Sequence, residues 1–377
     1  MPAYLDFCST TPVDGRVSAV VQHYMETEFG NAGSRTHEYG MTANQAVEEA
    51  RAHVAEGCGA KSDEVLFTSG ATEANNLALL GLREHAQTTG CRHALALAIE
   101  HKAVLEPLAA LAVARDVELE LVPVGERGWV DPGEIADRLR TDTFVVTTMH
   151  ANNETGVVQP LQGIAEALNG HPAYWHVDAA QTYGKTGGLA EERIDLISVS
   201  GHKLYGPMGV GALIARRRGY ERPPLTPLMF GGGQERGLRP GTVPVPLVAG
   251  FGEACRLALS EQEKRSSACA AERSKATTAL GPLGPFFNGD QDQVLPHVMN
   301  LSIPGLDAEA AMMILRDLVA ISNGSACTSS SYEPSHVLTA MGLAPERASG
   351  ALRISWSHDP VLANWSEVAE RLAYALR

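Results

Sequence analysis

The chain has 377 residues, of which 44% are hydrophobic and 20% charged, so it is no disordered or fibrous protein and fits a globular enzyme of about two to three domains. Its formal net charge of −14 argues against direct binding of nucleic acid or an anionic membrane, because phosphate contacts need clustered Lys and Arg. No apolar run approaches the roughly 18 residues that span a bilayer, and residues 1–6 lack the pattern of a secretory signal. We therefore expect a cytoplasmic protein.

Short runs rich in β-branched residues alternate with helical patterns between about residues 60 and 215. This alternation predicts an α/β domain built on a mostly parallel sheet, with functional residues at the strand ends. The predicted strands cover residues 65–68, 94–98, 117–122, 144–148, 174–178, 196–200 and 210–215, and the clearest helices cover 73–82, 131–140 and 161–168.

A second unit is expected after a Gly- and Pro-rich passage at residues 231–246. A long polar helical pattern follows over about 247–280, and three further strands are predicted at 298–303, 318–322 and 352–356. We predict a large domain at residues 13–250 and a small α+β domain formed by residues 1–12 and 251–377. The small domain includes a Ser-rich loop at 322–336.

A lysine at the end of a predicted strand is the first candidate catalytic residue. Lys203 follows Ser200 and His202, and a glycine-rich turn comes directly after it. Burial would lower the pKa of such a lysine and make its amine a nucleophile towards aldehydes, as in lysines that form Schiff bases. The alternative is a surface lysine beside a turn.

Polar residues at other strand ends complete a possible cofactor site. Asp178 ends a strand that is predicted to be buried, where a pyridinium nitrogen could be its cationic partner; an Asp at such a position can also cap a helix. Residues 68–76 run from strand to helix, and free N–H groups with the Thr72 hydroxyl could bind a phosphate; the alternative is a capping box. His101 and Asn152 follow two further strands.

Six cysteines are scattered along the chain without a Cys-x-x-Cys pair, so the sequence suggests neither a disulfide framework nor a metal site. Cys327 differs from the others because small polar residues surround it. This setting indicates an exposed, movable thiol, and the alternative is a structural cysteine in a loop.

Taken together, these segments resemble the group I cysteine desulfurases of the class V aminotransferase superfamily over nearly the whole chain. The resemblance implies a pyridoxal-phosphate (PLP) enzyme of the fold type I class (aspartate aminotransferase-like), with a large domain on a mostly parallel seven-stranded sheet and a smaller α+β C-terminal domain. The segments that carry it are residues 4–6, 29–31, 37, 69–76, 100–101, 152–156, 177–181, 200–207, 237–242 and 323–329.

The resemblance also implies a role for each site residue. Lys203 would hold PLP covalently, His101 would stack on its ring and move protons, and Cys327 would receive the sulfur. Arg353, assisted by Asn31, would bind the substrate carboxylate. The other implied PLP ligands are Ala71, Thr72, Asn152, Asp178, Gln181, Ser200, His202 and, from the partner subunit of a homodimer, Thr242.

The implied reaction removes sulfur from L-cysteine, giving L-alanine and a persulfide on Cys327 that passes to an acceptor protein. Family members serve iron–sulfur cluster assembly, tRNA thiolation or phosphorothioation of the DNA backbone. The overall likeness and the segment at residues 31–34 favour the last, with any DNA contact made through partner proteins. The alternatives are a selenocysteine lyase or another class V aminotransferase-like PLP enzyme, and an assembly subunit without turnover.

Overall fold

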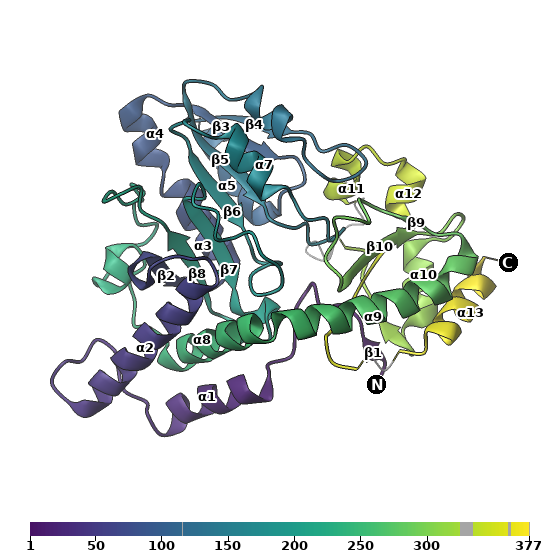
Figure 1. Ribbon diagram of the computed structural model, residues 1–377, viewed down its shortest axis with the longest axis horizontal. Helices are drawn as coiled ribbons and strands as arrows, with labels where there is room; N and C mark the ends of the chain where they lie inside the picture. The colour runs from purple at the N-terminus through teal and green to yellow at the C-terminus, as the bar shows by residue number, and fades with distance from the viewer. Residues whose placement is uncertain (115, 325–334, 361–362, 377) are drawn as a thin grey trace.

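A seven-stranded sheet forms the centre of the larger part of the molecule (Figure 1). The computed structural model describes residues 1–114, 116–324, 335–360 and 363–376. The strands are β2 (Val65–Thr68), β3 (His93–Leu97), β4 (Glu118–Val122), β5 (Thr143–Met149), β6 (Tyr174–Asp178), β7 (Leu196–Ser200) and β8 (Gly211–Ala215). Their order is β2-β8-β7-β6-β5-β3-β4, and β8 runs antiparallel to both of its neighbours while the other pairs are parallel. The predicted mostly parallel seven-stranded sheet is confirmed.

Helices cover both faces of this sheet. Successive side chains of a strand point to opposite faces, so Val65 and Phe67 of β2 enter one hydrophobic core and Leu66 enters another. The first core includes residues of α2 (Glu38–Glu56), α7 (Leu161–Ala167) and α8 (Val245–Ser260), and the second includes residues of α3 (Ala71–Leu80), α4 (Arg83–Thr89) and α5 (Lys102–Val113). This double cover explains why β7 and β8 are buried along their whole length.

Two further helices and several short turns complete this part of the chain. The helices are α1 (Gly15–Glu26) and α6 (Pro132–Ala136). Short 3₁₀ turns lie at η1 (Ser62–Glu64), η2 (Gly201–Lys203) and η3 (Gln234–Gly237). A fourth, η4 (Gly281–Leu283), comes later in the chain, directly after residue 280.

The long helix predicted over residues 247–280 is two helices, so that prediction was wrong in one respect. Helix α8 ends at Ser260, and α9 (Gln262–Leu280) continues towards the second part of the molecule (Figure 1). Between them the backbone of Glu261 leaves the helical region, with φ −110° and ψ 7°. The Glu261 carboxylate there accepts hydrogen bonds from Arg16 and Arg265, which hold the break in place.

The second part is built on a three-stranded antiparallel sheet in the order β12-β10-β9, beside a short parallel pair of β1 with β11. These strands are β1 (Ala3–Tyr4), β9 (Phe286–Phe287), β10 (Val298–Ser302), β11 (Val319–Ala320) and β12 (Ala351–Ser355). The helices are α10 (Ala308–Leu315), α11 (His336–Ala340), α12 (Pro345–Ser349) and α13 (Trp365–Ala375).

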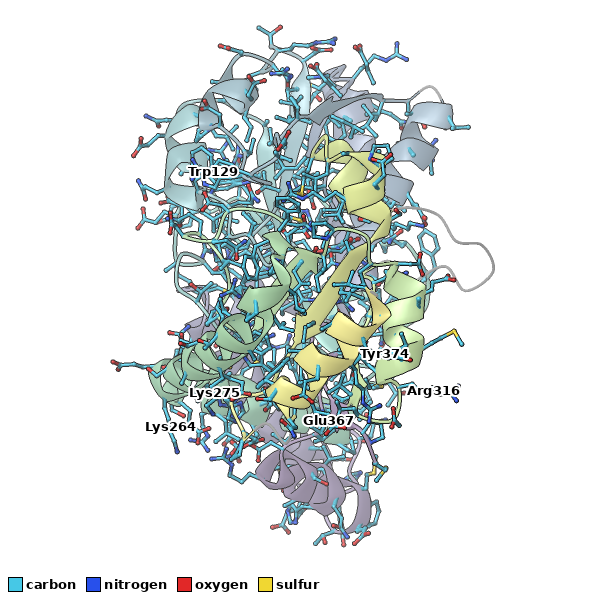
Figure 2. All side chains as sticks on the ribbon, turned by 90° about the vertical axis from the view of Figure 1, so that its right-hand side faces the viewer. Trp129, Lys264, Lys275, Arg316, Glu367 and Tyr374 are labelled. Carbon is cyan, nitrogen blue, oxygen red and sulfur yellow. The ribbon has the colours of Figure 1, made fainter. Side chains whose placement is uncertain are left out.

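A separate hydrophobic core joins β10 and β12 to α9, α10 and α13, and Leu5 near the N-terminus belongs to it. On the outer face of this part, Lys264 and Lys275 of α9 and Tyr374 of α13 point to solvent (Figure 2). Val337 of α11 instead joins the core of the large sheet. The exact domain limits, residues 13–250 against 1–12 with 251–377, remain a prediction. Among the described helices, none is long and apolar enough to cross a bilayer.

Candidate active site

A cavity of about 590 Å³ opens at the carboxyl ends of the sheet strands, a size typical of small-ligand sites. Met149, Asp178 and Ser200 line it from the last positions of β5, β6 and β7. Ser9 lines it from the N-terminal stretch that follows β1, and Arg353 lines it from β12. The predicted site residues that line this cavity are Ala71, Thr72, His101, Asp178, Gln181, Ser200, His202, Lys203 and Arg353.

Lys203 ends the 3₁₀ turn that follows β7. Its Nζ donates hydrogen bonds to the backbone oxygens of Cys8 (2.5 Å) and Ser9 (2.6 Å). Burial lowers the pKa of Lys203 to about 8, and the positive charge of Lys185 acts in the same direction. A substantial fraction of the amine is therefore neutral near pH 8, as a lysine that attacks an aldehyde requires.

His101 caps the N-terminus of α5 from the loop after β3. Its Nδ1 accepts a hydrogen bond from the backbone N–H of Ala103 at 3.1 Å, so the neutral ring carries its proton on Nε2. Burial lowers the pKa of His101, which favours this neutral form at physiological pH. The ring therefore lines the cavity as a neutral group that can take up a proton.

Asp178 is 7% exposed and is held at both carboxylate oxygens. Oδ1 accepts from the backbone N–H of Ala180 at 2.9 Å, and Oδ2 accepts from Nδ2 of Asn75 at 2.8 Å. No Lys, Arg or His in the described ranges forms an ion pair with it, which leaves a buried carboxylate without a cation. A pyridinium nitrogen would supply that charge, so Asp178 fits the role predicted for it.

The N-terminus of α3 is the place where a phosphate cradle is predicted, and Ala71 and Thr72 there line the cavity. Its cap is Gly70, which makes no side-chain capping bond, while Glu73 accepts a hydrogen bond from the backbone N–H of Ser69 at 2.7 Å, so only the glutamate half of a capping box is present. Gly70 has φ +153°, and Gly211 at the start of β8 lies directly beneath it: a Cβ on Gly211 would be 2.7 Å from the Gly70 Cα. The free N–H groups and the Ser200 side chain nearby suit a phosphate.

His202 and Gln181 complete the polar lining. Burial lowers the pKa of His202 to about 4, with the charge of Lys203 acting in the same direction, so the ring is neutral; its Nδ1 lies 3.1 Å from the Thr10 hydroxyl. Gln181 donates to the Cys8 carbonyl oxygen, while its own Oε1 is buried and has no partner in the part of the chain that the structure describes. That acceptor is free for a cofactor hydroxyl. The residues present thus fit PLP.

Arg353 enters the cavity from β12 and is 3% exposed. Its Nη2 donates to Asp6 (2.7 Å) and to the Ser9 hydroxyl (2.8 Å), and its Nη1 donates to the Asn153 carbonyl oxygen (3.1 Å). Nε is buried and, within the described ranges, has no partner. A fixed guanidinium with an unused donor is suited to an incoming carboxylate.

Three predicted ligands do not line the cavity of their own chain. Asn152 is fully buried, and its side chain instead closes the turn after β5: Oδ1 accepts from the N–H groups of Glu154 and Thr155, and Nδ2 donates to Ile99. Both polar atoms of the Asn152 side chain are thus engaged within the protein, and its contact with the PLP ring stays a prediction. Asn31 and Thr242 are exposed on loops. Cys327 lies outside the described residues, although Gly324, just before that gap, lines the cavity.

Several site residues were missed from the sequence. Asn75 lies within the quoted segment 69–76, but only the helical geometry of α3 shows that it reaches Asp178. Cys8 and Ser9 act through backbone oxygens, which leave no signal in residue type. Glu100 is fully buried, and burial followed by the charge of Asp178 raises its pKa well above the usual value. No group of His, Cys, Asp or Glu side chains in the described ranges could hold a metal ion.

Comparisons with known proteins identify the family of this chain. The family model for aminotransferase class-V matches residues 3–360. The chain is 43% identical over 354 residues to the mitochondrial cysteine desulfurase of Saccharomyces cerevisiae, covering 93% of this chain and 70% of that protein. It is 41% identical over 359 residues to the cysteine desulfurase IscS of Klebsiella pneumoniae, covering 94% and 88%. The crystal structure of DndA from Streptomyces lividans matches with 50% identity and a TM-score of 0.82, covering 93% and 98%.

Proposed function

Because the chain belongs to the aminotransferase class-V family and, within it, to the cysteine desulfurases, we propose that it removes sulfur from L-cysteine with PLP, leaving L-alanine and a persulfide on Cys327. The observation that carries the proposal is the meeting in one cavity of a lysine with a lowered pKa, a buried carboxylate without a cation, and an arginine with an unused donor. These are Lys203, Asp178 and Arg353.

Each residue has a task that its position supports. PLP, when bound, serves as an electron sink for the substrate. Arg353 binds the substrate carboxylate and so presents the Cα hydrogen to the lysine side of the cavity. The neutral amine of Lys203 takes the Cα proton, and the neutral ring of His101 can hold a proton at the other reacting atoms. Asp178 keeps a positive charge at the pyridine nitrogen.

In the sulfur-transfer step, one sulfur atom passes from the thiol of the substrate to the thiol of Cys327. The thiolate of Cys327 attacks the substrate sulfur, the C–S bond breaks with its electron pair remaining on Cβ, and Cβ then takes up a proton to complete L-alanine. The enzyme thiol is thereby converted to a persulfide, which an acceptor protein removes. The reaction consumes no external oxidant, because the substrate carbon is reduced as the sulfur is oxidised.

A homodimer is part of the proposal. Large apolar side chains are exposed on α1, on α2, on the loop between them and on the passage before α8: Met25 (58%), Met41 (58%), Phe29 (67%) and Phe230 (90%). Asn31 and Thr242, which do not line the cavity of their own chain, lie on loops near these residues in sequence. Pairing of two copies would cover the apolar surface and could bring Thr242 to the partner's phosphate cradle.

We place the enzyme in the cytoplasm and propose that its acceptor is a protein, consistent with the acidic net charge of −14. DndA is more similar to this chain, at 50% identity, than IscS of Klebsiella pneumoniae is at 41%. This difference favours a branch other than that of IscS. Phosphorothioation of DNA is the pathway that we propose, with DNA reached through partner proteins.

The reaction can be tested with purified protein loaded with PLP. We expect an absorbance band near about 420 nm that changes on addition of L-cysteine, as for a lysine-bound cofactor, and equal amounts of alanine and transferred sulfur. Lys203→Ala should abolish both. Exchange of amino groups with keto acids, without alanine formation from cysteine, would contradict the assignment.

A further inference from the structure

The two described ends of the segment 325–334 lie against one buried side chain, that of Glu154. This segment contains Cys327. Glu154 belongs to residues 152–156, which follow β5. The proposed reaction gives Glu154 no role of its own. It is 3% exposed, and within the described ranges no Lys or Arg forms an ion pair with it.

The first end is fixed by the edge of β12 and by Glu154. Ser322 exchanges backbone hydrogen bonds with Arg353, at 2.6 and 3.2 Å, and its hydroxyl accepts from the N–H of Gly324 at 3.0 Å. Gly324 has φ +88°, and a Cβ on it would lie 3.0 Å from Oε2 of Glu154. The Gly324 backbone therefore packs directly on the Glu154 carboxyl group while lining the cavity.

The second end is fixed by the same carboxyl oxygen. The Ser335 hydroxyl donates to Oε2 of Glu154 at 2.5 Å and accepts from the N–H of Leu338, which caps α11. Next to it, Nε2 of His336 lies 2.9 Å from the carbonyl oxygen of Glu100, the residue before His101. The second end is thus held at two points, by Glu154 and by Glu100, each next in sequence to a residue that lines the cavity.

Glu154 itself has little freedom. Its backbone N–H donates to Oδ1 of Asn152 at 2.8 Å, and its carbonyl oxygen accepts from Nδ2 of Asn300 at 3.1 Å. Burial raises the pKa of Glu154, while the hydrogen bond from Ser335 opposes that rise. A buried carboxyl group whose side-chain partner is Ser335 links a rigid strand-end turn to both ends of one chain segment.

We propose that Glu154 is a positioning residue for sulfur transfer: it holds Gly324 and Ser335 together beside the cavity and so sets where the segment bearing Cys327 begins and ends. This inference rests on the proposed function, because Cys327 is the sulfur acceptor there. It assigns Glu154 no contact with substrate or cofactor. Removal of the Glu154 carboxyl group should therefore slow the step that needs the Cys327 thiol and leave unchanged the steps that need only Lys203.

The test separates these steps in PLP-loaded protein. Glu154→Ala should slow single-turnover persulfide formation on Cys327 by about 10- to 100-fold, the usual cost of misplacing a reacting group. Exchange of the Cα hydrogen of L-alanine with solvent deuterium, which needs the lysine but no thiol, should stay within about twofold of the wild-type rate. Glu154→Gln keeps an oxygen acceptor for Ser335 and should restore persulfide formation. Glu64→Ala, which removes another buried carboxyl group that accepts backbone hydrogen bonds, is the matched control.

A double-mutant cycle identifies the partner. If Glu154 acts through Ser335, the variant carrying both Glu154→Ala and Ser335→Ala should lose no more persulfide activity than the worse single variant, since the two residues share one interaction. Ser335→Thr keeps the hydroxyl and should retain activity. Independent, multiplicative losses would contradict the proposed link.

Amide hydrogen exchange supplies a readout that does not depend on activity. Glu154→Ala should increase exchange in α11 and around residues 322–324, and Glu64→Ala should not. Persulfide formation at the wild-type rate in Glu154→Ala, or an equal loss of persulfide formation and alanine exchange, would overturn the inference. A wild-type protein that forms no persulfide would instead overturn the proposed function, and unchanged amide exchange in Glu154→Ala would still refute the role of Glu154.

Discussion

Lys203 is reactive because folding changes the proton affinity of its amine. Its pKa falls from an ordinary 10.5 to about 8 on burial, so between these values the unfolded chain binds more protons at this residue than the folded chain does. The ammonium therefore opposes folding most fully below pH 8, and this cost disappears as the pH rises towards 10.5. The nucleophile needed for catalysis is obtained at the expense of stability.

This linkage can be measured on the protein without cofactor. Lys203→Met should be more stable than the parent at pH 7 by about 1–3 kcal/mol, and the difference should shrink as the pH rises from 8 to 10.5. Lys264→Met, at an exposed position of α9 (Figure 2), is the control and should change stability little. Denaturant unfolding at a series of pH values gives both curves, and a difference that grows with pH would contradict the account.

Asn75 offers a second test at the scale of one residue. Its side chain donates to Asp178 inside the protein, and its removal should leave the carboxylate less well oriented towards the cofactor. We expect Asn75→Ala to weaken PLP binding by about tenfold, the cost of one hydrogen bond to a charged group. Asn76→Ala, whose side chain bonds the Thr72 carbonyl oxygen instead, is the matched control. Spectroscopic titration with PLP compares them, and equal affinities of the two variants would count against this role.

The positions of the strand ends could be predicted from the sequence because they follow from the pattern of apolar and polar residues along the chain. Alternation of buried strands and helices gave all seven strands of the large sheet within a few residues, and so brought Asp178, Ser200 and Lys203 to one edge. The break at Glu261 could not be predicted, since the helical pattern continues through it. Of the two arginines that bond the Glu261 carboxylate, Arg265 is local, four residues on, and only Arg16 makes a tertiary contact. The two-residue strands β1 and β9 are too short to show a period.

The side chain of Asn152 shows a second limit of sequence reasoning. An amide after a strand can turn towards a ligand or towards its own backbone, and residue type does not distinguish the two. In this structure the Asn152 side chain turns towards its own backbone, because the N–H groups of Glu154 and Thr155 would otherwise be buried without acceptors.

The close packing of Gly211 in β8 against Gly70 at the start of α3 can be used to test how these two elements form the proposed phosphate cradle. Gly211→Ala would place a Cβ 2.4 Å from the Val199 carbonyl oxygen and 2.7 Å from the Gly70 Cα, so β8 and the start of α3 must separate. We expect a loss of about 1–3 kcal/mol in unfolding free energy, together with weaker PLP binding. Gly187→Ala, which meets no atom within 4 Å, should be neutral in both measurements. Equal behaviour of the two variants would refute the packing argument.

At the scale of the whole molecule, the proposed homodimer accounts for both the exposed apolar residues and the position of Thr242. Coexpression of a Lys203→Ala chain with a Thr242→Arg chain tests whether sites are shared. Each variant alone should be inactive, whereas the mixture should recover about a quarter of wild-type activity, because half of the dimers are mixed and each mixed dimer has one complete site. A mixture without activity, formed from chains that still dimerise, would show that Thr242 serves its own chain.

The central claim is that sulfur from L-cysteine arrives on Cys327. Mass spectrometry of PLP-loaded protein after a single turnover, without reductant, measures this directly. We expect the Cys327 peptide to gain the mass of one sulfur atom in step with alanine release, and Cys327→Ser to form no persulfide. Alanine release with the added sulfur on another cysteine, or with none on the protein, would contradict the account.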